Sequence, residues 1–214
     1  MKKSWLMAAL VSMTPLATTA GETPDRYVPG EPRLVSLPAQ RVLAVTAKGD
    51  PNGVAGPAYR KLYRTFYAYA DKAGKRHAGA PLARWGTAQI ESPKSEWTGT
   101  YAIPVSDAFP DVAKNGMRIE TWEYGLTAEI LHIGPYGDEA ADIAALKGFI
   151  ARNGFTIKGD HEEVYLKGPG MIIKGDPARY RTLIRYSVER VGEPVAPIAG
   201  KSTQQTAAPV GGKE

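Results

Sequence analysis

The 214-residue chain contains no cysteine and only three histidines. Without cysteine the protein has no disulfide bond, no catalytic thiol and no lipoprotein anchor. The histidines are scattered, and His132 has no second histidine or carboxylate at the spacing of a metal site. We therefore expect neither a metal nor a cofactor.

The sequence also lacks a hydrophobic run long enough for a membrane span, which needs roughly 20 apolar residues. The apolar stretch Trp5–Val11 is shorter, follows a basic head that contains Lys2 and Lys3, and is followed by small residues that end at Ala20. This order is typical of a cleavable secretory signal peptide over residues 1–20, cut after Ala20. We expect a periplasmic or secreted protein without stable membrane insertion.

A strong charge of one sign is missing as well. The formal net charge is +5, and two of the positive charges belong to the expected signal peptide. A net charge this small affects solubility and does not indicate a nucleic-acid partner. The glycine-rich segment Gly53–Gly56 lacks the Lys and Ser/Thr of a phosphate-binding P-loop.

Apolar periodicity is absent at both ends of the remaining chain. Residues 191–214 are rich in Pro, Ala, Gly, Gln and Thr, which predicts a disordered tail that could reach an envelope partner. Residues 21–33 contain three prolines and read as a linker. One folded domain is thus expected over residues 34–190, long enough to build its own core.

Within that domain, residues 41–105 and 126–188 show the same order of strand, turn, helix and two strands. The first copy begins with a strand over residues 41–47. A helix follows, with Pro57 in its first position and Gly74 at its end. Two strands over residues 81–86 and 99–105 complete the copy. The apolar stripe of the helix is formed by Tyr59, Leu62, Tyr63, Phe66 and Ala70.

The second copy begins with a strand over residues 126–133 and continues with a helix that Asp138 caps and Asn153-Gly154 ends. Its last strands cover residues 162–166 and 182–188, and residues 117–125 add a strand or hairpin arm before it. Two such β-α-β-β units predict an α+β fold. The sheet is expected to be mainly antiparallel, with two helices on one face and a ligand cleft on the other.

Several motifs occur in order through the second copy. They are His132–Tyr136 (HIGPY), Asn153–Phe155 (NGF), Gly159, Glu163–Leu166 (EVYL) and Thr182–Val188 (TLIRYSV). In these motifs the chain resembles the GyrI-like small-molecule-binding domain. This domain occurs in gyrase-inhibitor-like proteins and as the effector-binding domain of multidrug-responsive regulators. The resemblance covers roughly residues 33–190 and implies a duplicated fold with a ligand cleft between the halves. Lys167-Gly168-Pro169 departs from the family's usual loop, and nothing before Leu34 resembles a DNA-binding helix-turn-helix.

The strand over residues 162–166 carries the main candidate residue, Glu163. Strand alternation puts Val164 and Leu166 on one face, expected to be the helix-covered core, and Glu163 with Tyr165 on the other. From the residues alone, Glu163 reads as a solvated strand end paired with Lys or Arg. The resemblance favours a ligand anchor, because family members place a Glu and an aromatic residue there. Glu162 is expected to be solvated at the strand edge.

Aromatic residues could form the walls of the cleft, although aromatics in strands more often serve packing. Trp85 corresponds to Tyr165 in the repeat, and Tyr101 lies in the neighbouring strand. Trp122 shares a face with Tyr124, but the sequence leaves open whether that face is cleft or core. The candidate ligand-binding residues are Glu163, Tyr165, Trp85, Tyr101, Trp122 and Tyr136. His132 is expected to be a hydrogen-bonded structural residue.

These features favour an exported small-molecule-binding protein, with an aromatic cleft anchored by Glu163, for hydrophobic or cationic compounds. The alternative is a hydrolase of reactive electrophilic small molecules that uses Glu163 as its general base. A third possibility is an interaction module, in which Trp85 and Tyr165 pack against each other and fill the cleft.

Overall fold

The computed structural model of the protein describes residues 27–70, 78–88, 92–169 and 175–192. The expected signal peptide, the end of the first helix at Gly74 and nearly all of the expected tail lie outside these ranges. None of the helices in the described ranges is long and apolar enough to cross a membrane.

Within the described ranges, nine strands form one sheet in the order β1-β6-β9-β8-β3-β4-β2-β5, with β7 added at the end of β9. All of these strand pairs are antiparallel. The strands are β1 (Arg33–Leu37), β2 (Gln40–Lys48), β3 (Leu82–Trp85), β4 (Thr98–Pro104), β5 (Met117–Trp122), β6 (Gly125–Ile133), β7 (Phe155–Ile157), β8 (His161–Lys167) and β9 (Arg181–Arg190). Together with two α-helices, this confirms the predicted α+β class.

The two predicted units meet at the β3–β8 pair in the middle of the sheet. From there the order is β3-β4-β2-β5 in one direction and β8-β9-β6-β1 in the other. The central register places Ala83 opposite Glu163 and Trp85 opposite His161. The two predicted units therefore occupy separate halves of the sheet, while their origin by duplication stays a prediction.

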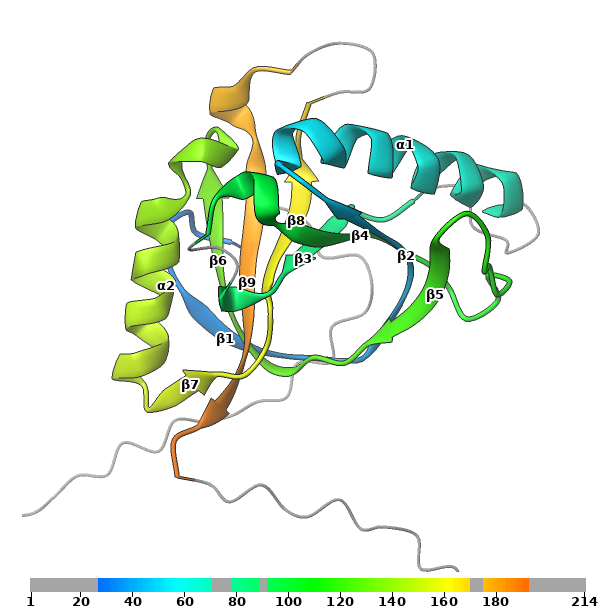
Figure 1. Cartoon of the computed structure of the whole chain (residues 1–214). Helices are drawn as coiled ribbons and strands as arrows, with labels where there is room; N and C mark the ends of the chain where they lie inside the picture. Colours follow the sequence, from blue (N-terminus) through cyan, green and yellow to red (C-terminus); the bar gives the residue numbers. More distant parts are fainter. Residues whose placement is uncertain (1–26, 71–77, 89–91, 170–174, 193–214) are drawn as a thin grey trace, which may run out of the picture.

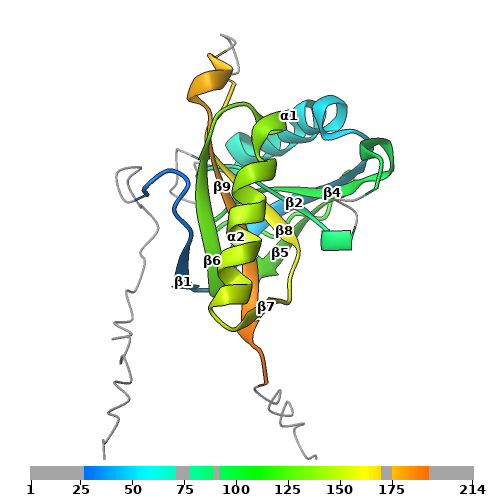
Figure 2. The ribbon, with the colours of Figure 1, turned by 90° about the vertical axis from the view of Figure 1, so that its left-hand side faces the viewer.

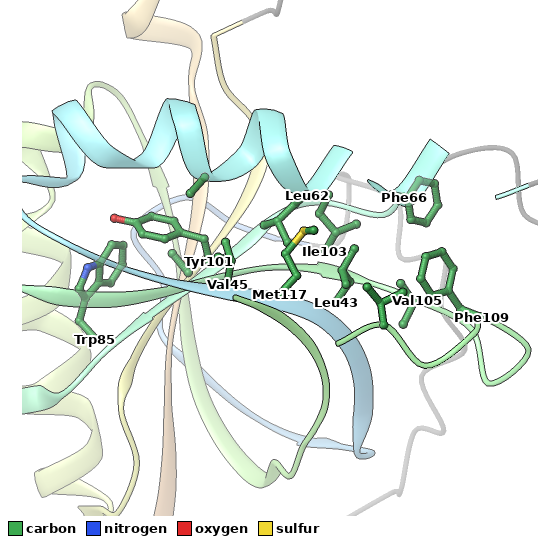
Figure 3. Packing of buried hydrophobic residues seen from close by; sticks show 13 residues of the cluster. Leu43, Val45, Leu62, Phe66, Trp85, Tyr101, Ile103, Val105, Phe109 and Met117 are labelled. Atoms are coloured by element: carbon green, nitrogen blue, oxygen red, sulfur yellow. The ribbon is translucent and has the colours of Figure 1, made fainter. Parts of the chain in front are cut away.

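Both helices lie on one face of the sheet. Helix α1 (Pro51–Ala70) lies along β2 and β4, and α2 (Ala140–Arg152) lies along β6 and β9 (Figures 1 and 2). Leu62 and Phe66 of α1 join a buried cluster with side chains of β2 and β4, including Leu43 (Figure 3). A separate cluster joins α2 to β6 and β9.

Residues opposite each other in antiparallel strands share a face. Such a row crosses the sheet from Val45 through Tyr101, Ala83, Glu163 and Ile184 to Ile130.

Helix α1 begins six residues earlier than the sequence predicts, at Pro51 instead of Pro57. The Oδ1 atom of Asp50 accepts a hydrogen bond from the backbone N of Asn52 at 2.9 Å, and the carbonyl of Asp50 accepts from Gly53 and Val54. Pro51 therefore takes the first helical position, where the missing N–H costs nothing. The expected position of Pro57 is wrong, because it lies inside the helix.

Of the two predicted ends of α2, only the C-terminal end agrees with the structure. Asp138 belongs to the 3₁₀-helix η4 (Tyr136–Asp138), and Glu139 stands at the cap position without a side-chain cap bond, so the predicted cap is wrong. Asn153 is the C-cap, and Gly154 has a φ of +75°. A positive φ favours glycine, which explains the predicted stop.

The helix-free face is buried by the sheet itself. A third buried cluster on this face contains Val164 of β8. It also contains Leu131 and Leu183 from β6 and β9, and Trp122 and Tyr124 from the end of the strand order at β5. The strands β1, β2 and β5 curl towards this face (Figure 1). The described part of the sheet thus has apolar cores on both faces.

Candidate functional site

Strand β8 separates its side chains as the sequence predicts, but with the faces exchanged. Tyr165 packs with the cluster under α1, whereas Val164 belongs to the cluster on the helix-free face. Glu163 and Tyr165 therefore lie on the helix-bearing face, not opposite it. The expectation took an apolar face to be the helix-covered one, and here the curled sheet covers that face instead.

Glu163 lies in the seam between the two helix-covered cores. Its cross-strand neighbours on this face are Ala83 and Ile184, which belong to the clusters under α1 and α2 respectively. The side chain of Glu163 is 12% exposed. It is the charged residue in an otherwise apolar and aromatic row across the sheet.

His161 and Tyr165 form hydrogen bonds with the Glu163 carboxylate. Nε2 of His161 lies 3.1 Å from Oε1, and the hydroxyl of Tyr165 donates to Oε2 at 2.7 Å. The other ring nitrogen of His161 hydrogen-bonds with the Tyr186 hydroxyl at 2.8 Å. Burial by itself raises the pKa of Glu163, but the bonds and charge of His161 and the bond from Tyr165 outweigh it and hold that pKa below its usual range. Among the described residues, no Lys or Arg forms an ion pair with Glu163.

A second carboxyl group, which the sequence did not suggest, lies beside Glu163. Glu139 at the start of α2 is 5% exposed, and its Oε1 atom has no hydrogen-bond partner among the described residues. Burial raises the pKa of Glu139 to about 9, and the negative charge of Glu163 adds to this rise. In the sequence Glu139 resembles an ordinary exposed acid of a first helical turn, so no local signal predicts its burial.

Aromatic rings surround the two carboxyl groups. The centroid of the Tyr165 ring lies 5.3 Å from Tyr136 and 6.1 Å from Tyr59, and Tyr59 lies 5.5 Å from Tyr101. Each of these pairs meets edge to face, the arrangement that ring quadrupoles favour. Trp85 continues the series, 6.1 Å from Tyr101 and 6.0 Å from His161.

The structure therefore brings together five of the six candidate residues, which are Glu163, Tyr165, Trp85, Tyr101 and Tyr136. Tyr59 joins them, although the sequence assigns it only to the apolar stripe of α1. The rings of Trp85 and Tyr165 are connected through Tyr101 and Tyr59. Figure 3 shows Trp85 and Tyr101 beneath α1. We call Glu163, Glu139, His161 and these rings the seam cluster.

Trp122 is the candidate that lies elsewhere. It faces the helix-free side, where the guanidinium of Arg84 lies 3.9 Å from its ring centroid and 4.8 Å from that of Tyr124. Its Nε1 donates to Glu120 at 2.7 Å. The question that the sequence left open for Trp122 and Tyr124 is thereby answered, since both belong to the core of the helix-free face.

Glu162 is buried, so the expectation of a solvated residue is wrong. Its side chain is 3% exposed and accepts a hydrogen bond from Nε of Arg84 at 2.6 Å. Nη1 of Arg185 lies 3.7 Å away, and the Tyr124 hydroxyl also donates to this carboxylate. These partners come from other strands, which is why the local sequence did not reveal them.

His132 has the hydrogen-bonded environment that the sequence suggests for a structural histidine. Its Nδ1 lies 2.8 Å from Asp142, and its Nε2 lies 3.2 Å from the carbonyl of Pro135. Within the described ranges, no group of three or more His, Asp or Glu side chains is placed to hold a metal ion.

Comparison with solved structures finds the same fold in several other proteins. A hydrolase from Listeria innocua is 19% identical, with a TM-score of 0.63 over 75% of this chain and 93% of that one. A second structure of a hydrolase from Listeria innocua is 20% identical, with a TM-score of 0.63 over 77% and 95%. The EcmrR C-terminal domain is 19% identical, with a TM-score of 0.55 over 75% and 98%.

Likeness at these identities shows the fold alone. None of the curated proteins compared matches the chain significantly. The family described as the GyrI-like small molecule binding domain, however, has a sequence model that matches residues 30–186, most of the chain. The resemblance seen in the motifs is thereby confirmed, and the chain belongs to the GyrI-like small-molecule-binding domain family.

Proposed function

We propose that the domain binds a hydrophobic, positively charged small molecule at Glu163. The observation that carries this proposal is a nearly buried carboxylate in the seam between two cores, with tyrosine rings around it and no Lys or Arg partner in the described ranges. Aromatic faces and a carboxylate both attract an organic cation. The apolar rings would also supply the buried area that a hydrophobic ligand needs.

The neighbouring residue provides the contrast that supports this proposal. Glu162 is buried against two arginines, so its charge is already balanced within the protein. Glu163 has hydrogen bonds from His161 and Tyr165, and His161 is its only ion-pair partner among the described residues. A buried charge that the protein balances only in part is stabilised when a ligand brings the opposite charge. A cationic ligand would fill this role.

We infer that a ligand displaces a ring to reach Glu163, because the side chain is only 12% exposed. Tyr136 lies on η4 after a Gly-Pro turn, is half-buried, and contacts the rings of Tyr165 and Tyr180. Trp85 and Tyr101, in contrast, are almost fully buried in the sheet. We therefore propose that a ligand enters beside Tyr136, because displacing this ring disturbs the core least.

The same proposal includes export, on the basis of the basic head, short apolar stretch and small residues before Gly21. Sequencing the N-terminus of the protein recovered from fractionated cells tests it. A chain that begins at Gly21 in the periplasm or medium supports export, and a chain that retains Lys2 and Lys3 in the cytoplasm contradicts it.

Binding is tested by titrating the protein with a lipophilic phosphonium cation while recording tryptophan fluorescence, to which Trp85 contributes. We expect Glu163→Gln to weaken binding about tenfold or more, since it removes the charge and keeps the shape. Asp107→Asn, which removes an exposed carboxylate, is the matched control and should bind like the wild type. Equal affinity of Glu163→Gln and wild type would show that Glu163 is not the anchor.

Hydrolysis is the second candidate function, and the opposite pKa shifts of Glu139 and Glu163 favour it. Two carboxyl groups whose environments separate their pKa values can serve as acid and base in one reaction. Glu163, ionised, would accept a proton from water as the water oxygen bonds to an electrophilic carbon. Glu139, protonated, would donate its proton to the leaving atom as the carbon–leaving-atom bond breaks.

The hydrolase proposal predicts a specific pH profile for the turnover of a strained-ring electrophile. The rate should rise as Glu163 loses its proton, below the usual range of a glutamate, and should fall as Glu139 loses its proton at about 9. Glu139→Gln should remove the alkaline limb and slow the reaction about a hundredfold. If a broad panel of electrophiles shows no turnover that depends on Glu163, the domain binds without catalysis.

A further inference from the structure

A ladder of alternating charges crosses five neighbouring strands on the helix-free face. The cross-strand pairs run from β3 through β8, β9 and β6 to β1, and we call this series the charge ladder. In order, it consists of Arg84, Glu162, Arg185, Glu129 and Arg33. It lies on the face opposite the seam cluster, since Glu162 and Glu163 alternate along β8.

The arginines outnumber the glutamates in this ladder. Nε of Arg185 donates to Glu129 at 2.8 Å, and Nη2 of Arg33 lies 2.6 Å from the same carboxylate. Glu162 accepts from Nε of Arg84 at 2.6 Å. Within the ladder, three guanidinium groups thus face two carboxylates.

A pocket of about 220 Å³ opens at the β3 end of the ladder. Arg84, Arg185 and Glu162 line it together with Tyr124, and Asp160 and Glu123 line it as well. The volume is below the roughly 300–1,000 Å³ of pockets for drug-sized ligands. A small metabolite is therefore the size of ligand that it suits.

The two arginines have hydrogen-bond donors to spare in this pocket. Among the described residues Arg84 forms hydrogen bonds only through Nε, and its guanidinium lies against the Trp122 and Tyr124 rings. Arg185 likewise makes its hydrogen bond through Nε, and its Nη1 is 3.7 Å from Glu162. Among the described residues the Nη atoms of both have no hydrogen-bond acceptor. Fixed guanidinium forks of this kind match the geometry of a carboxylate.

Two further residues that line the pocket, Asp160 and Glu123, carry negative charges, opposite to those of the arginines. Asp160 and Glu123 are exposed, and neither forms an ion pair among the described residues. The pocket therefore combines partly buried positive donors with exposed negative acceptors. We propose that it is a second binding site, for a small zwitterion of the amino-acid type, with the carboxylate on Arg84 and Arg185 and the ammonium group towards Asp160 and Glu123. This site is independent of the function proposed for Glu163.

The test is isothermal titration calorimetry of the purified full chain with individual L-amino acids. Acetate and ethylammonium, each with one of the two charges, serve as comparison ligands. Arg84→Lys keeps the positive charge but loses the fork, and Asp160→Asn with Glu123→Gln removes the negative charges from exposed positions. Asp107→Asn removes an exposed carboxylate outside the pocket and is the matched control.

We expect at least one amino acid to bind at millimolar concentration or below, and about tenfold more tightly than acetate or ethylammonium. Arg84→Lys and the double variant should each weaken that binding several-fold, while Asp107→Asn should not change it. Circular dichroism of Arg84→Lys checks that a loss of binding does not come from unfolding. The proposal is overturned if no amino acid binds, if acetate binds equally well, or if the double variant binds like the wild type.

Discussion

At the scale of single residues, Glu162 and Glu163 show how two adjacent carboxylates acquire different roles. Strand alternation, visible in the sequence, turns them to opposite faces of β8. Their environments depend on other strands, because Arg84 and Arg185 reach Glu162 whereas His161 and Tyr165 reach Glu163. The sequence predicts the separation of the two side chains. It does not predict that Glu162 is buried, since its partners lie at least 23 residues away along the chain.

Glu139 gives the first prediction at this scale, through the pH dependence of stability. Its pKa rises from 4.5 to about 9 on folding, so the folded protein binds this proton more tightly than the unfolded chain. Its contribution to stability is therefore present below pH 4.5 and is lost as the pH rises towards 9. We expect Glu139→Gln to stabilise the protein at pH 8, on the order of 2 kcal/mol in the free energy of unfolding.

Urea denaturation at pH 5 and pH 8 measures this effect. The stabilisation by Glu139→Gln should be small at pH 5 and larger at pH 8. Asp138→Asn changes the exposed neighbour of Glu139 and should show no such difference between the two pH values. If both variants change the free energy of unfolding at pH 8 by the same small amount, Glu139 is not held in its protonated form.

At the scale of elements, β8 explains why one face was assigned incorrectly. An alternating strand with an apolar face is usually read as resting on helices, but β8 has apolar neighbours on both sides. The helices themselves were predictable from their apolar stripes, with an error at the start of α1, where Asp50 and Pro51 begin the helix earlier. Strands β1 and β7 were not predicted. They have five and three residues, too few for a clear alternation.

The charge ladder gives a prediction at this scale, because β3, β8 and β9 meet through Glu162. We expect Glu162→Gln to destabilise the protein by about 3 kcal/mol, since it leaves Arg84 and Arg185 without their shared buried carboxylate. The free energy of unfolding from urea denaturation measures the change.

Arg33→Gln, at the outer end of the ladder, is the comparison. Arg33 is 32% exposed, so water screens its pairing with Glu129 and the variant should cost about 1 kcal/mol or less. Equal losses in the two variants would contradict a role for burial in the strength of the ladder.

At the scale of the whole molecule, one curled sheet divides the described part of the protein into three cores and two distinct polar regions. Helices α1 and α2 each cover one half of a face, and Glu163 lies where their cores meet. The fold class and the order of the main elements could be predicted from apolar patterns and turns. The curl could not, because it depends on pairing between strands far apart in sequence. For this reason the sequence placed Trp122 with the candidate ligand residues, whereas the fold places it on the other face.

The most direct test of a ligand site at Glu163 is a crystal structure of the protein with a bound lipophilic cation. The account predicts that the cation lies between α1 and α2, in contact with the Glu163 carboxylate and the Tyr165 ring, and that the Tyr136 ring has moved aside. A cation bound elsewhere, with the rings of the seam cluster still in contact with one another, would contradict the account.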